Sequence, residues 1–161
     1  MTLPAMAGFS AAAGIFIVAG GFVAAVDSAS PFPHGAWLAA YFVLVGGISQ
    51  LLLGPGRIVL GLPRPSATIR RLQLVLWNLG GIAVPAGVLV GAPGIVTVGS
   101  AALLGALACF ARGIRWVTRE RRAGTLAYGA LILGLAMSVV IGSALADAAP
   151  GAWLVTAAIT Q

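Results

Sequence analysis

The chain has 161 residues, of which 60% are hydrophobic and only 7% are charged. Because soluble domains typically carry about 25% charged residues, this composition indicates a protein that folds in lipid. The net charge of +6 does not indicate a nucleic-acid partner, since all nine basic residues are arginines in two short segments, 57–71 and 112–122. A lone cysteine, Cys109, excludes an internal disulfide and every metal motif built from several cysteines.

The apolar segments predict five membrane-spanning helices, because about 20 apolar residues suffice to cross the hydrocarbon core. In chain order we expect them at about residues 8–26, 35–53, 72–90, 95–111 and 124–146. Loop chemistry separates the first two helices at residues 27–33, and Gly54 and Pro55 are expected to stop the second. The third and fourth helices should form a hairpin, since residues 72–111 carry no charge and the turn residues 91–94 divide them in two.

Several further features complete the predicted fold. Pro85 is expected to kink the third helix, and residues 112–122 are expected to extend the fourth as a polar helix. No cation precedes Arg57, so the first helix should be retained rather than removed as a signal peptide. The tail, residues 148–161, would reach only about 21 Å as a helix, so it should lie along the outer leaflet or form a partial sixth helix. The fold class is therefore all-α, a polytopic transmembrane bundle of helical hairpins, with residues 1–161 as one integral membrane domain.

The distribution of arginine predicts how the bundle is oriented. With five crossings, both arginine segments fall on one side of the membrane, whereas the other side carries Asp27, His34 and Asp147. The positive-inside rule then places the arginines and the N-terminus in the cytoplasm and the C-terminus outside. We expect a multi-pass protein of the cytoplasmic (inner) membrane.

Small residues recur at every fourth position of the fourth and fifth predicted helices. Residues four apart share one helix face, and small ones let a neighbouring backbone approach closely. We favour an internal seam between these two helices; the alternative is an interface with a partner subunit or a second copy. On either interpretation Cys109 is a buried small thiol rather than a reactive one. The expected packing residues are Thr97, Ala101, Gly105 and Cys109 in one helix and Ala130, Gly134, Ser138, Gly142 and Ala146 in the other.

Two amides, Gln50 and Asn78, stand out within the spans. Each is seven residues from an arginine, Arg57 or Arg71, which places both about 10 Å inside the same membrane boundary. Equal depth predicts an interhelical hydrogen bond, typically worth about 1 kcal/mol or less in membranes. Contact with a polar substrate is the alternative, although a transport path usually has more ionisable groups.

His34 is the only histidine, and it lies on the same predicted side as Asp27 and Asp147. One imidazole and two carboxylates are an acceptable ligand set for a divalent metal. All three nevertheless fall in segments that are normally solvated, so they are weak candidates and we predict neither a metal nor another cofactor. Haem ligation is disfavoured because no second histidine is available.

The arginines are expected to contact anionic lipid headgroups or an acidic partner, since cations beside a membrane attract both. They are Arg57, Arg64, Arg70, Arg71, Arg112, Arg115, Arg119, Arg121 and Arg122. No catalytic constellation is evident: the spans hold no Ser–His–Asp set, no paired carboxylates and no phosphate-binding glycine loop.

These features favour a non-catalytic protein, an accessory or structural subunit of a larger membrane complex that packs through small-residue helix faces. One alternative is a small oligomeric transporter or channel for a small solute, with a pore lined by groups such as Gln50 and Asn78. A second is a membrane redox or metal-binding protein that uses His34 at the extracytoplasmic face. The first predicts a partner subunit or a homo-oligomer, and all three predict a lipid bilayer as the environment.

Overall fold

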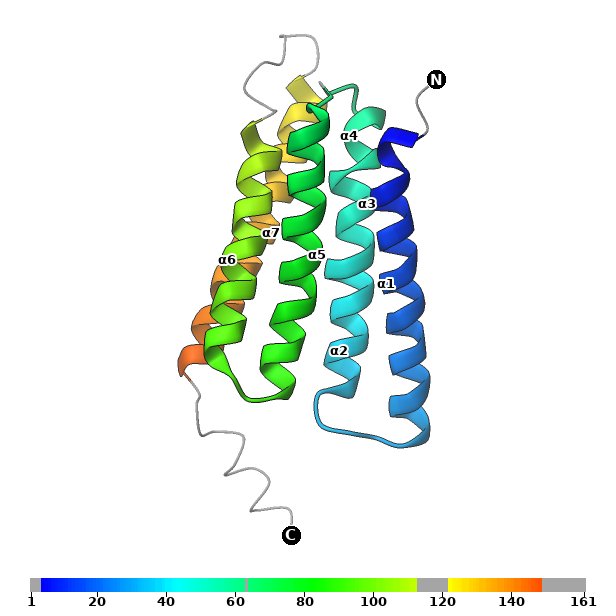
Figure 1. Cartoon of the computed structure of the whole chain (residues 1–161), viewed down its shortest axis with the longest axis vertical. Coiled ribbons are helices and arrows are strands. Elements are labelled where there is room, and N and C mark those ends of the chain that lie inside the picture. The colour runs from blue at the N-terminus through cyan, green and yellow to red at the C-terminus, as the bar shows by residue number, and fades with distance from the viewer. Residues whose placement is uncertain (1–3, 63, 113–121, 149–161) are drawn as a thin grey trace.

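The computed structural model describes residues 4–62, 64–112 and 122–148, which form helices joined by short turns, with no strand among them (Figure 1). Within these residues five helical segments are long and apolar enough to cross a membrane, which is consistent with a multi-pass membrane protein. They are Ala7–Ala29, Gly35–Val59, Ala67–Leu89, Pro93–Arg112 and Ala123–Ile141. The prediction of an all-α helical bundle is confirmed.

The first hairpin pairs α1 (Pro4–Ala29) with a second segment made of three consecutive helical pieces. These are α2 (Gly35–Tyr41), the π-helix η1 (Phe42–Ile48) and α3 (Ser49–Leu53). Gly46 and Gly47 are buried where η1 meets α1, and a side chain at either position would collide with Phe16 or Ile17. The side chains of Phe16 and Ile17 therefore pack directly on the backbone of η1, and the π-helical stretch lies at this contact.

The second segment continues past Gly54, which corrects the expectation that Gly54 and Pro55 end it. The helix turns at Gly54 and resumes as α4 (Pro55–Val59), with Pro55 in its first turn. Proline is tolerated there because its missing N–H would have no partner within the helix. As a result Arg57 lies on a helix rather than in a loop.

Two other boundaries differ from the predicted ones. Helix α1 runs through Asp27, which was expected in a loop. Helix α5 (Ala67–Leu89) begins early, because the Ser66 hydroxyl accepts a hydrogen bond from the Ile69 N–H at 3.3 Å and caps it. The arginines at positions 70 and 71 are therefore helical.

The second hairpin, α5 and α6 (Pro93–Arg112), turns at Gly91, whose φ of 65° is the left-handed conformation that glycine adopts without strain. Glycines let these two helices approach closely: a Cβ added to Gly80 would lie 2.6 Å from the Gly99 carbonyl oxygen. Pro85, expected to kink the helix, lies buried within α5. The predicted hairpin is confirmed.

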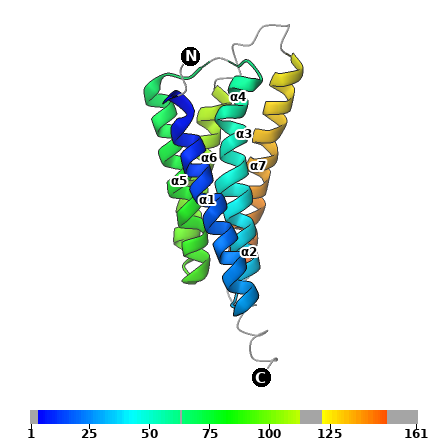
Figure 2. The same cartoon turned by 90° about the vertical axis from the view of Figure 1, so that its right-hand side faces the viewer.

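Helix α7 (Arg122–Ala148) lies at the edge of the bundle beside α6, as the two views of Figures 1 and 2 show. Only 11% of the most apolar 18-residue stretch of this helix is buried, against 22–39% of the corresponding stretches in the other four spans. Most of its surface therefore faces away from the rest of the chain.

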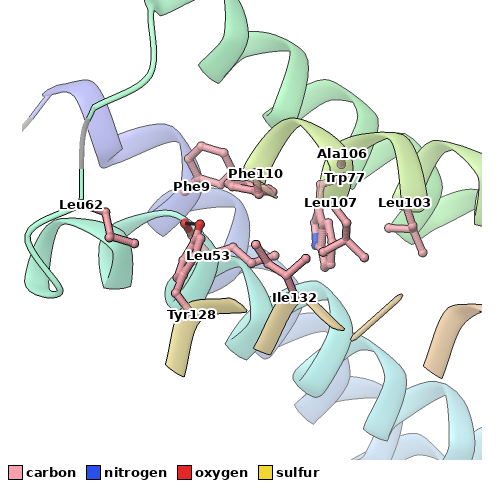
Figure 3. Packing of buried hydrophobic residues seen from close by; sticks show 10 residues of the cluster. All are labelled: Phe9, Leu53, Leu62, Trp77, Leu103, Ala106, Leu107, Phe110, Tyr128 and Ile132. Carbon is pink, nitrogen blue, oxygen red and sulfur yellow. Dashed lines mark hydrogen bonds between the residues drawn. The ribbon is translucent and has the colours of Figure 1, made fainter. Parts of the chain in front are cut away.

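All five spans contribute to one apolar cluster, which we call the core cluster (Figure 3). Phe9 of α1 packs against Phe110 of α6 with ring centroids 5.9 Å apart, and Phe110 in turn contacts Trp77 of α5. Tyr128 of α7 donates a hydrogen bond of 2.6 Å to the Leu53 carbonyl at the end of α3. The other members are Leu62, Leu103, Ala106, Leu107 and Ile132.

Charge is sorted between the two ends of the bundle. The start of α1, helix α4, the start of α5 and the end of α6 lie together at one end (Figure 1). This end carries Arg57, Arg64, Arg70, Arg71 and Arg112, and we call it the arginine end. Asp27, near the end of α1, lies at the opposite end.

Candidate functional site

Gln50 and Asn78 form a reciprocal amide pair between α3 and α5. Gln50 Nε2 donates to Asn78 Oδ1 at 3.3 Å, and Asn78 Nδ2 donates to Gln50 Oε1 at 3.2 Å. The predicted interhelical hydrogen bond is therefore present. Each amide also donates to the carbonyl four residues earlier, Gln50 to Gly46 of η1 at 2.6 Å and Asn78 to Leu74 of α5 at 2.7 Å.

A third polar contact reinforces the same helix pair. The indole Nε1 of Trp77 donates to the Val45 carbonyl at 3.1 Å, and the Trp77 ring is 1% exposed. A tryptophan buried this deeply needs a partner for its N–H, and the π-helical backbone of η1 provides it. These contacts connect the two hairpins, and their donors are used within the chain.

A second group of buried polar side chains lies at the arginine end. Arg57 of α4, Gln73 of α5 and Tyr128 of α7 are 2%, 1% and 1% exposed. Arg57 Nε and Nη1 and Gln73 Nε2 are buried without a hydrogen-bond partner among the residues that the structure describes. We use the name Arg57 cluster for three side chains that share burial, Arg57, Gln73 and Tyr128.

Sequence reasoning missed this cluster in two ways. It treated Arg57 as one solvated loop cation among nine, and it did not consider Gln73. The signal available for Gln73 was its position four residues before Trp77, which puts both on one face of α5. Nothing comparable marks Arg57, because its burial follows from the continuation of the helix beyond Gly54.

The structure assigns local roles to two of the weak metal candidates. Asp27 Oδ1 accepts a hydrogen bond from the Phe32 N–H at 3.2 Å and so braces the turn between α1 and α2. His34 adopts a left-handed φ of 68° before α2, and its ring lies edge-on to Trp37 with centroids 6.5 Å apart. Among the described residues no group of three or more His, Cys, Asp or Glu could hold a metal ion. The side chain of Asp147 lies outside them.

The small residues do not form the expected seam between α6 and α7. Thr97, Ala101, Ala130, Gly134 and Ser138 are all exposed, so the internal-seam interpretation is wrong for them. Large side chains decide which face turns inward: α6 buries Leu103, Leu107 and Phe110, and α7 buries Tyr128 and Ile132. Gly105 and Cys109 are half-buried, and the side chains of Gly142 and Ala146 lie outside the described set.

The arginines differ sharply in environment. Arg64, Arg71 and Arg112 are exposed and Arg70 is half-buried, which suits contact with lipid headgroups or a partner. Arg57 alone is buried among the arginines whose side chains are described. Arg115, Arg119, Arg121 and the side chain of Arg122 lie outside the described residues, as does the tail 149–161.

The geometry thus offers two internal polar groups, the amide pair and the Arg57 cluster, and one exposed small-residue face on α7. Comparisons of the chain with protein-family models, with curated proteins and with solved structures found no match.

Proposed function

We propose that the chain is a non-catalytic subunit of a larger membrane complex, and that the outward face of α7 contacts the partner protein. One observation carries this proposal: α7 exposes Ala130, Gly134 and Ser138, which lie four residues apart on one helix face. A Cβ added to Gly134 would meet no atom within 4 Å. Small residues on one face of a helix favour close association with another helix in lipid.

Helix packing elsewhere in the bundle supports a packing role for the small residues of α7. Gly80 and Gly99 already bring α5 and α6 into close contact, so the chain uses small residues for helix packing where a partner helix is present. The equivalent residues of α7 have no such neighbour among the described residues. A partner helix from another protein would use them in the same way.

The amide pair favours a packing role over a transport role. Gln50 and Asn78 bind each other and the backbone, so their amide hydrogens are already used in hydrogen bonds within the chain. A solute path would need polar groups that are free to exchange partners as the solute passes.

We propose that the arginine end faces the cytoplasm, in the cytoplasmic membrane. Five described arginines lie at this end, and the N-terminal end of α1 lies with them. The positive-inside rule favours this orientation over its inverse.

The proposal is tested by purifying the tagged chain in a mild detergent and measuring the native mass of the assembly. The expected result is a complex of fixed stoichiometry with a second protein, which Gly134→Leu disrupts. Gly14→Leu is the matched control, because Gly14 is exposed on α1 and a Cβ there also meets no atom within 4 Å. A lone chain or a homo-oligomer as the purified particle, or equal behaviour of the two variants, would contradict the proposal.

A further inference from the structure

We infer that residues 42–48 are a conformational switch, in which docking of Trp77 and Asn78 of α5 selects the π-helix η1 over a continuous α-helix. In the π form this stretch contains one residue more than an α-helix would need to join α2 to α3. The switch couples the packing of the two hairpins to the rotation of α2 against α3. The inference goes beyond the proposed subunit function and does not depend on it.

The stretch 42–48 is π-helical although both of its neighbours, α2 and α3, are α-helical. The Ser49 N–H that follows it donates to the Leu44 carbonyl, five residues earlier. In an α-helix the same N–H would donate to the carbonyl four residues earlier. A π-helical turn therefore takes up one residue more than an α-helical turn, and such stretches are rare enough to need a specific cause.

Side chains supply hydrogen bonds to three consecutive carbonyls of η1. The acceptors and donors are Leu44 with Ser49 Oγ at 2.8 Å, Val45 with Trp77 Nε1 at 3.1 Å, and Gly46 with Gln50 Nε2 at 2.6 Å. A carbonyl oxygen has two lone pairs, so it accepts a side-chain bond in addition to a backbone bond. Three polar contacts thus converge on the one stretch of this segment that departs from α-helical geometry.

Two of these three contacts depend on α5. Trp77 belongs to that helix and is 1% exposed, so its indole N–H has no water as an alternative partner. Gln50 belongs to α3, but its amide is oriented by the two hydrogen bonds that it exchanges with Asn78, at 3.2 and 3.3 Å. Adjacent residues of α5 therefore act on two adjacent carbonyls of η1.

The sequence of η1 is compatible with either helical form. It contains neither proline nor a charged residue, so nothing in it prevents an α-helix. The adjacent glycines Gly46 and Gly47 weaken the α-helical form, which lowers the stabilisation that α5 must contribute. Phe16 and Ile17 of α1 pack on these glycines, so η1 is contacted by α1 as well as by α5.

Conversion to the α form would change which face of α2 meets α1. Removal of the extra residue from the π-helical turn corresponds to a rotation of α2 relative to α3 by about 100°. Because a helix with its side chains is about 10–12 Å across, a site on the surface of α2 would move by about 8 Å. The present rotation buries Leu38 and Ala39 and places the Ala39 carbonyl beside Gly20 of α1.

Deletion of one residue tests whether η1 contains an extra one. Leu44 is exposed, and the chain without it should form a continuous α-helix that keeps α2 and α3 at their present rotation. We expect its thermal midpoint in detergent to stay within about 5 °C of the wild type. Deletion of Val18, an exposed residue of α1, is the control and should lower the midpoint at least twice as far. Equal losses for the two deletions would overturn the inference.

Trp77→Phe tests the selection by α5, because it keeps an aromatic ring and removes the N–H donor. In the full-length chain it should lower the thermal midpoint by about 2–4 °C more than it does in the chain without Leu44. The comparison cancels the loss of packing that both chains share. Equal losses in the two chains would show that Trp77 contributes packing alone, and would overturn the inference.

A distance between two spin labels reports the rotation directly. In a Cys109→Ser chain, labels at Ala40→Cys and Val59→Cys occupy exposed positions on either side of η1. Both labels lie on the same segment, so their separation changes whichever of the two helices rotates. The wild-type chain should give a single distance.

The double variant Trp77→Phe and Asn78→Leu removes both contacts from α5. It should give a second distance that differs from the first by several ångströms, whereas Leu79→Ala, an exposed change on the same helix, should leave the distance unchanged. A folded double variant that retains the wild-type distance would overturn the inference. If the double variant does not fold, the two deletion experiments decide.

Discussion

Gln50 and Asn78 exchange hydrogen bonds in both directions, at 3.3 and 3.2 Å, across the contact between the two helical hairpins. Gln50 is fully buried and Asn78 is partly so. In lipid no water competes for such amides, so they specify which faces of α3 and α5 meet. The pair therefore fixes the register of α3 against α5 in an otherwise apolar contact.

Replacing either amide by leucine should weaken this contact by a modest amount. We expect Gln50→Leu and Asn78→Leu each to destabilise the bundle. The double-mutant cycle should give a coupling free energy of about 0.6 kcal/mol, and no more than about 2 kcal/mol. Reversible unfolding in mixed micelles measures these values. Zero coupling would mean that the two amides do not stabilise each other.

Gly80→Ala should separate α5 from α6. The new Cβ would lie 2.6 Å from the Gly99 carbonyl oxygen and 2.8 Å from Leu103 Cγ, and a backbone atom cannot rotate away. We expect a loss of about 1–3 kcal/mol in the free energy of unfolding. Gly105→Ala is the control on the same helix pair, because its nearest contact, Leu76 Cδ1, is at an ordinary 3.6 Å. Equal destabilisation by both changes would refute the close contact at Gly80.

Tyr128→Phe should loosen α7. The Tyr128 hydroxyl donates a hydrogen bond from α7 to the Leu53 carbonyl of α3, and loss of this bond should lower the free energy of unfolding by about 1 kcal/mol. Tyr41→Phe is the matched control, because the Tyr41 hydroxyl is buried without a partner among the described residues, and its removal should be neutral or stabilising. Thermal unfolding of both variants checks the contrast, and a larger loss at position 41 would reverse it.

The spans and the second hairpin could be predicted from the sequence because they depend on composition and turn chemistry alone. The charge-free stretch 72–111 is longer than one crossing, and the glycine and proline between its halves supply the turn. The hydrogen bond between Gln50 and Asn78 followed from their equal distance to the nearest arginines.

The continuation at Gly54 could not be predicted, because a Gly-Pro pair both ends helices and begins them. The continuation depends on tertiary contacts. Phe9 packs against Gly54, and the Tyr128 hydroxyl donates a hydrogen bond to the Leu53 carbonyl just before the bend. The burial of Arg57 depends on this local event, so it was missed as well.

The sequence pattern also could not predict which face of α7 turns inward. Ala130, Gly134 and Ser138 have the spacing of a packing seam, yet Tyr128 and Ile132 are the residues that fill the core. A helix with apolar residues all around gives no hydrophobic contrast by which to choose a face. In the structure, the face of α7 that carries Tyr128 and Ile132 is the one packed into the core cluster.

The orientation of the arginine end is the claim on which the membrane account depends most, and cysteine labelling tests it directly. In a Cys109→Ser background, Ser30→Cys reports on the turn after α1 and Ala67→Cys on the start of α5, both at exposed positions. With a membrane-impermeant maleimide on intact cells, we predict labelling at position 30 and labelling at position 67 only after permeabilisation. Labelling of position 67 in intact cells, with position 30 protected, would contradict the account.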